Sequence, residues 1–289
     1  MAAHHGNWLT PAEEAVWVSS VLLKMPLFAI LGALWMGVHR LSVAYWPLED
    51  MAVPAKSHRK WHNDVVASTH AWFALLAGAY ALFVVGIPEG TEERPFATSN
   101  AFVVVSGVGF SYFFFDSCFI AVNSVLSNGG SMVYLHHFIF VAGYVVSTLY
   151  PASGHMREYY LFQLTELSTI FLQLNWFLDK AHVKGLPVTV NGWVLLLTFG
   201  LRCYINALAA YHANVHILRH DLWSFPTPPQ LYAAFPHVPW GAVARIYVVM
   251  HSIFPVFMLG LNLYWYSILL RRAFAYLSGD KSANDTCRA

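Results

Sequence analysis

The sequence predicts an all-α membrane protein with seven transmembrane helices. Of its 289 residues, 57% are hydrophobic and only 11% are charged, whereas soluble domains carry about 25% charged residues. A soluble protein of this length would have too few charged residues to cover its surface. Several apolar runs approach or exceed the roughly 20 residues that a helix needs to cross a bilayer.

Most of the predicted spans are joined by short connections, which makes consecutive helices antiparallel neighbours. They cover residues 18–46, 64–87, 101–125, 132–150, 159–178, 188–212 and 243–271. Lys24 and Pro26 interrupt the first span, and Pro255 predicts a kink in the last one. Residues 213–242 are rich in proline and aromatic residues, which argues against a long helix there.

Basic residues predict the orientation of the chain. They are concentrated after the first and fifth spans and in the C-terminal tail. Because Lys and Arg favour the cytoplasmic side, we expect the C-terminus there and the N-terminus on the opposite side. The formal net charge of +1 gives no indication of a nucleic-acid partner, and we expect none.

Ionisable groups occur inside the predicted spans, where they are costly unless they face a partner or a cavity. His70, Asp116 and His136 lie on three consecutive spans in the same half of the membrane. We expect them to line one internal cavity that opens on the basic side. Each could instead make only a hydrogen bond between helices. For His137, which points about 100° away from His136 around the helix, we expect structural or lipid-interface contacts ahead of chemistry.

A second polar pair is predicted on the fifth and sixth spans. Glu166 and Arg202 lie at similar distances from the short connection between these spans. Because an unpaired Arg near mid-membrane would be hard to tolerate, we predict a direct or water-bridged ion pair. Its role is expected to be structural rather than catalytic.

Two histidine patterns raise the question of a metal or a haem. His212, His216 and His220 recur every fourth residue and would share one face of a helix, which could bind a metal. His70 facing a histidine of the fourth span could hold a haem, but Asp116 is a poor neighbour for an apolar porphyrin. We expect no metal and no cofactor. The aromatic run of residues 110–115 is interpreted as ordinary lipid-facing or packing surface.

Several motifs, in the right order, resemble the TLC domain family. Residues 60–84 resemble the first core helix of that domain, and residues 164–180 resemble its helix with the Glu-x-Ser-Thr pattern. The residues that match family positions are Ser68, His70, Asp116, His136, His137, Glu166, Ser168, Thr169, Asn175, Trp176, Phe177, Asn191, Gly192, Arg202, Asn262 and Trp265.

The resemblance implies a barrel of six helices around a lipid-accessible cavity, preceded by one extra helix. It divides the chain into an N-terminal segment with the first transmembrane helix (1–55), a TLC domain (56–277) and a polar tail (278–289). Residues of the lipid cavity would be His70, Asp116, His136, Glu166, Asn175, Trp176 and Arg202.

The TLC family includes ceramide synthases, which carry an acidic element after the double histidine. No acidic residue occurs here between His137 and Pro151, so the chain is more similar to the small TLC-only proteins. We therefore expect a protein that binds or handles a sphingolipid, phospholipid or acyl chain in lipid homeostasis, without enzymatic activity.

Two alternatives stay open. One is a lipid N- or O-acyltransferase, in which His136 or His137 is the general base and Asp116 orients it. The other is a non-enzymatic accessory subunit of a larger membrane complex, such as a respiratory-chain assembly. The expected partners are membrane lipids and other membrane subunits. The resemblance places the protein in the endoplasmic reticulum or another endomembrane, and the mitochondrial inner membrane is the alternative.

Overall fold

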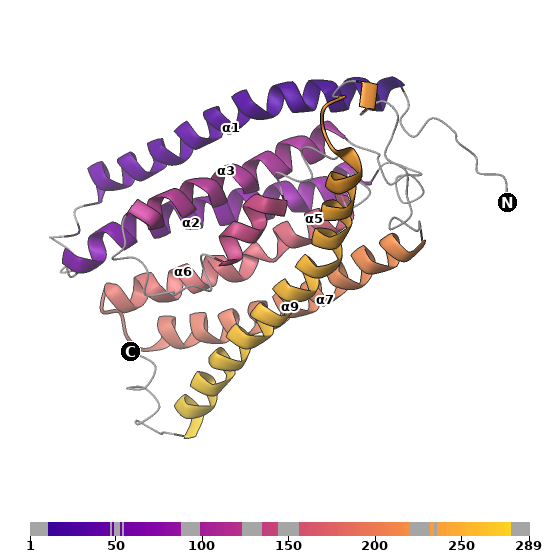
Figure 1. Cartoon of the computed structure of the whole chain (residues 1–289). Coiled ribbons are helices and arrows are strands. Elements are labelled where there is room, and N and C mark those ends of the chain that lie inside the picture. The colour runs from indigo at the N-terminus through magenta and orange to yellow at the C-terminus, as the bar shows by residue number, and fades with distance from the viewer. Residues whose placement is uncertain are drawn as a thin grey trace.

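The computed structural model describes residues 11–46, 48, 53, 55–87, 99–122, 135–143, 156–219, 232–233 and 236–278, without the side chains of residues 11–25 and 56. Within these ranges the regular elements are all helical, as predicted (Figure 1). They are α1 (Pro11–Tyr45), α2 (Ala55–Tyr80), the π-helical turn η1 (Ala81–Val85), α3 (Asn100–Val122), α5 (Met156–Leu164), α6 (Glu166–Lys180), α7 (Leu186–Arg219) and α9 (Trp240–Ser278). Residues 135–143 form a further helical segment.

Five of these helices are long and apolar enough to cross a membrane. They are Pro26–Tyr45, Ser57–Val85, Asn100–Val122, Leu186–Arg219 and Trp240–Ser278. The ends of the predicted third span (123–125) and fourth span (132–134 and 144–150) lie outside the described residues, as does the polar tail from residue 279. The chain is therefore an integral membrane protein with several membrane-spanning helices.

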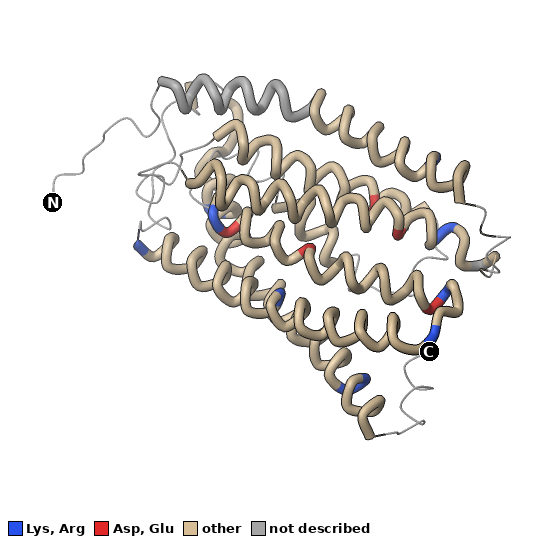
Figure 2. The backbone as a smooth tube through the Cα atoms, turned by 180° about the vertical axis from the view of Figure 1, so that it is seen from behind, with Lys and Arg blue, Asp and Glu red and all other residues tan. Residues whose placement is uncertain are grey.

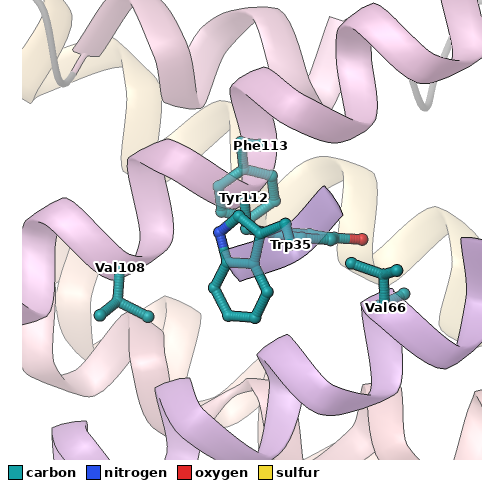
Figure 3. Packing of buried hydrophobic residues seen from close by; sticks show 6 residues of the cluster. Trp35, Val66, Val108, Tyr112 and Phe113 are labelled. Carbon is teal, nitrogen blue, oxygen red and sulfur yellow. The ribbon is translucent and has the colours of Figure 1, made fainter. Parts of the chain in front are cut away.

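Helix α1 packs on one side of the bundle, against α3 and α2. The helix continues through Pro26, so this proline does not divide the first predicted span. Trp35 is fully buried, and its indole nitrogen donates a hydrogen bond to the Ser111 hydroxyl at 3.0 Å. Around it, Val66, Val108, Tyr112 and Phe113 form a core cluster (Figure 3). This cluster joins α1 to α2 and α3.

The predicted fifth span is interrupted at Thr165. The backbone there keeps helical dihedrals (φ −66°, ψ −18°), but two hydrogen bonds have three-residue spacing: Thr165 to the Phe162 carbonyl, and Ser168 to the Thr165 carbonyl. Such tightening is 3₁₀-like and divides the segment into α5 and α6. Side chains with hydroxyl groups drive it, because those of Thr165 and Ser168 bond to the same two carbonyls.

The connection between α6 and α7 is a tight turn. His182 has a positive φ of 55° and Gly185 one of 83°, and the Val183 amide bonds to the Leu178 carbonyl. This short turn places α6 directly against α7, as predicted. Helix α7 continues to Arg219, so the prediction that the helix ends near residue 212 was wrong. Helix α9 is helical through Pro255.

The outer faces of the helices are apolar. Phe83, Leu197 and Ile30 are each more than 60% exposed, which suits contact with lipid rather than water. Because lipid removes the hydrophobic drive for helix association, small residues at close approaches are important. At Gly78 of α2, an added Cβ would lie 2.5 Å from the Gln163 Cβ of α5. This glycine therefore allows α2 and α5 to touch.

Charged residues occur mostly near the helix ends (Figure 2). A small number of acidic positions lie instead along the middle of the bundle (Figure 2). Asp64, Asp116 and Glu166 are all buried. These buried carboxylates mark the region in which the polar groups of the fold gather.

Candidate functional site

The centre of the candidate site is a contact between Asp116 of α3 and two neighbouring elements. Its Oδ1 accepts a hydrogen bond from the Asn63 amide of α2 at 2.6 Å. Its Oδ2 lies 3.1 Å from Nδ1 of His137, on the helical segment 135–143. The His137 contact is within the distance of an ion pair. It is not a hydrogen bond, and Nδ1 has no hydrogen-bond partner among the described residues.

His137 is buried at 6% exposure, so of the two expected roles, a structural contact or a lipid-interface contact, its surroundings match the structural one. His136 lies beside it and points to α9, where its Nδ1 is 3.4 Å from the Met258 sulfur. The Trp265 ring also packs against His136, with centroids 6.0 Å apart. Adjacent positions on one helix thus give the two histidines different surroundings: His137 faces a carboxylate, and His136 faces sulfur and aromatic rings.

His70 belongs to the same region but is held by stacking. Its ring lies 3.9 Å from that of Tyr112 at an interplanar angle of 11°, and Trp35 packs edge-on at 5.9 Å. Nε2 of His70 has no hydrogen-bond partner among the described residues. Tyr112 in turn packs against His137, with centroids 6.4 Å apart. The structure therefore brings His70 near Asp116 and the double histidine, with Tyr112 between them.

Arg202 of α7 is fixed by several oxygen acceptors rather than by one carboxylate. Its Nε donates to Asn262 Oδ1 of α9 at 2.8 Å. Its Nη1 donates to the Thr165 carbonyl at 3.2 Å and to the Ser168 and Thr169 hydroxyls at 3.2 and 3.0 Å. The guanidinium thus joins α7, α9 and the tightened turn between α5 and α6.

The predicted pair of Glu166 and Arg202, direct or water-bridged, is not a direct contact, and a water-bridged pair stays a prediction. Among the described residues, no contact within 4.0 Å joins their charged atoms, although Glu166 acts electrostatically on Arg202. Glu166 also acts on His137. The physical reason is that the guanidinium has other acceptors: Asn262 on α9, and the hydroxyls and carbonyl of the turn at Thr165.

Asn175 and Trp176 lie farther along α6, towards its basic end. The Trp176 ring packs against Trp61 of α2 at 5.9 Å, and the Lys60 ammonium lies 4.7 Å from its centroid. Asn175 accepts a hydrogen bond of 3.5 Å from Asn191. Within the described part of the chain, neither residue contacts Asp116, so their place in a lipid cavity stays a prediction.

An aromatic cavity of about 80 Å³ lies beside the histidines. Its apolar walls are Phe102, Phe110, Phe113, Phe140, Phe162, Phe254 and Pro255, and Glu158, Tyr159 and His251 add polar atoms. Phe113 and Phe140 stack with centroids 4.4 Å apart. The same two rings contact the double histidine: the Phe113 centroid is 5.2 Å from that of His137, and the Phe140 centroid is 4.9 Å from that of His136.

The lining of this cavity differs from the predicted one. None of the seven predicted cavity residues lines it, and Phe110 and Phe113 come from the aromatic run that we had interpreted as ordinary surface. Whether the predicted residues line a lipid site stays a prediction. Two of them neighbour the cavity: His70 contacts Phe113, and His136 contacts both Phe113 and Phe140.

Sequence reasoning missed Asn63 and Asp64. Asp64 is buried and pairs with Lys60 one turn earlier, with an oxygen 2.6 Å from the ammonium nitrogen. A usable signal existed for Asn63: it precedes His70 by seven residues, so both lie on the same face of α2. If His70 faces the bundle interior, the seven-residue spacing predicts that Asn63 does so too.

The histidine repeat on α7 gives no visible metal site. His212 and His216 lie on the helix, whereas His220 lies outside the described residues. Within the described ranges, no group of three or more His, Cys, Asp or Glu side chains is arranged to hold a metal ion.

The fold and the site define an all-helical integral membrane protein with buried carboxylates, histidines and an aromatic cavity. The family model of the TLC domain matches residues 60–271, which is most of the sequence. The chain therefore belongs to the TLC domain family, whose members are linked to lipid metabolism or sensing. No curated protein and no solved structure gives a match to the chain.

Proposed function

We propose that this protein binds a membrane lipid inside the helical bundle and acts in lipid homeostasis. The observation that carries the proposal is that Phe113 and Phe140 line the aromatic cavity and also contact the double histidine, whose His137 lies 3.1 Å from Asp116. Amphiphiles need an apolar space next to a small number of polar groups. An acyl chain in the cavity would bring its headgroup to Asp116 and the histidines.

The proposed topology has seven transmembrane crossings: α1, followed by six crossings that form the TLC barrel. In this arrangement, α5 and α6 form one crossing, because Thr165 keeps helical dihedrals between them, and residues 135–143 belong to another. The packing of α1 against only α2 and α3, among the helix pairs with substantial contact, supports its place outside the barrel. The C-terminus is proposed to lie on the cytoplasmic side.

A lipid-extraction experiment tests the proposal. The full chain is purified in mild detergent, and its bound lipids are extracted and quantified by mass spectrometry. Ala213→Leu places a larger side chain into the cavity wall and is expected to reduce retained lipid about fivefold or more. Ala33→Leu makes the same change on the exposed face of α1 and should leave retention unchanged. Equal retention in both variants would contradict binding in this cavity.

An acyltransferase is the second candidate, favoured by the contact of Asp116 with His137. A carboxylate that orients an imidazole raises its basicity, so His137 would be the general base and Asp116 the orienting group. His136, which faces Met258, is less suited to that role. If acyl transfer occurs, Asp116→Asn and His137→Ala would each abolish product formation in membranes supplied with acyl donors, while the protein stays folded.

A non-enzymatic accessory subunit of a larger membrane complex is the third candidate. The exposed apolar faces of α1 and α9 could contact lipid or a second membrane protein. Purification under mild detergent distinguishes these cases, because a subunit would copurify with stable partners. We propose an endomembrane location such as the endoplasmic reticulum, with the mitochondrial inner membrane as the alternative.

A further inference from the structure

The amide of Asn63 uses its donor but not its acceptor. Its Nδ2 donates to Asp116 Oδ1 at 2.6 Å, whereas its Oδ1 has no hydrogen-bond partner among the described residues. The orientation of the amide follows from chemistry, because a carboxylate can only accept hydrogen bonds and must face the NH₂ group. Asn63 is only 7% exposed, so Oδ1 is a buried acceptor inside the bundle.

The two basic side chains described at the site, those of Lys60 and Arg202, donate to other groups. Lys60 is bound by both oxygens of Asp64, at 2.9 and 2.6 Å. Arg202 is bound by Asn262 and by the groups of the Thr165 turn. Neither cation donates to Asn63 Oδ1 in the described part of the chain. Because a buried unsatisfied acceptor costs free energy, this open acceptor favours a bound group that brings its own O–H or N–H.

We propose that Asn63 is a specificity-determining residue of the lipid site, which selects a headgroup with a hydrogen-bond donor. This inference rests on the proposed function, since it names the chemistry of the headgroup that the lipid carries. Asn63 holds Asp116 with Nδ2 and accepts the hydroxyl or amine hydrogen of the headgroup with Oδ1. Asp116 supplies a second acceptor beside Asn63, so a headgroup whose outer atoms only accept hydrogen bonds is disfavoured.

Two photoactivatable lipid probes test this selection. One is a diacylglycerol analogue with a free hydroxyl, and the other is its O-methyl ether, which has the same chains but no donor. Each is incorporated into phosphatidylcholine nanodiscs with the full chain and crosslinked. Crosslinked peptides are then quantified by mass spectrometry. The hydroxyl probe is expected to label the cavity-lining peptides about tenfold more than the ether, as for loss of one well-placed hydrogen bond.

Asn63→Ala should remove most of this preference and bring the ratio to about twofold or below. The matched control is Asn206→Ala. Asn206 is also buried, its Nδ2 donates to the Arg202 carbonyl, and its Oδ1 also lacks a partner in the described part of the chain. Because no described contact joins Asn206 to Asp116, this variant should keep the tenfold ratio. Size-exclusion chromatography checks the fold of each variant.

The outcomes separate the inference from the proposed function. Equal labelling of the cavity by both probes on the unaltered chain would overturn the selection and leave lipid binding in place, with water satisfying Asn63. No cavity labelling by either probe would overturn lipid binding itself. A full preference in folded Asn63→Ala would remove Asn63 from the site. The comparison of the two probes needs no variant, so it decides the question even where a substitution prevents folding.

Discussion

Asp116 Oδ2 lies 3.1 Å from Nδ1 of His137, across the interface between α3 and the helical segment 135–143. The other carboxylate oxygen is bound by Asn63 of α2. Three membrane-embedded elements are thus joined through one buried acid. In lipid, where apolar contacts alone give little drive for association, such polar contacts fix how helices are placed against each other.

Asp116→Ala is expected to destabilise the protein by about 1–3 kcal/mol, because it leaves the buried Asn63 amide without its acceptor. Thermal unfolding in detergent measures the effect. Asp179→Ala is the control: Asp179 is exposed, and within the described ranges its side chain pairs only with the adjacent Lys180, so its loss should stay within about 0.5 kcal/mol. Equal shifts in the two variants would show that the Asp116 contacts do not stabilise the fold.

Asn262→Leu is expected to destabilise by about 1.5–3 kcal/mol, because it removes a hydrogen bond from the buried Arg202 charge. In an Arg202→Met background, the same change should cost much less, since no charge remains to be satisfied. A double-mutant cycle followed by thermal unfolding measures this coupling. Glu166→Gln should couple more weakly to Arg202. The prediction fails if Glu166 shows the stronger coupling.

Gly78→Ala is expected to destabilise by about 1–3 kcal/mol, because the new methyl group would lie 2.5 Å from the Gln163 Cβ and 3.1 Å from the Tyr160 carbonyl oxygen. Gly260→Ala on α9 meets no atom within 4 Å and should instead be neutral or stabilise by up to about 1 kcal/mol. Unfolding curves of both variants in the same detergent check the contrast. Similar behaviour of the two would argue against the close packing of α2 on α5.

The fold class and the burial of the polar residues could be predicted from the sequence, because charges inside long apolar runs have few tolerable locations. The contacts between individual side chains of the site could not be predicted. Depth along a helix placed Glu166 opposite Arg202, but depth says nothing about competing acceptors. The tightened turn at Thr165 supplies these acceptors, and it depends on local hydroxyl–carbonyl bonds. Likewise, the aromatic run of α3 contributes to a cavity only because Phe140 and Phe254 pack opposite it.

Asn63 shows a different limit. Its position seven residues before His70 indicates that it lies on the inward face of α2. The spacing does not indicate which residue it contacts there. The identity of that partner depends on how α3 is placed against α2. That placement is set by packing around Trp35 (Figure 3), which no single segment of the sequence reveals.

The most direct measurement is to map where a photoactivatable lipid attaches to the protein. The full chain in nanodiscs is crosslinked through a probe whose reactive group lies at the end of an acyl chain, and labelled residues are located by mass spectrometry. Our account predicts labels on the cavity walls, at Phe113, Phe140, Phe162 or Phe254, and their loss in Ala213→Leu. Labels confined to outer faces, such as Phe83 and Tyr264, would contradict a lipid site inside the bundle.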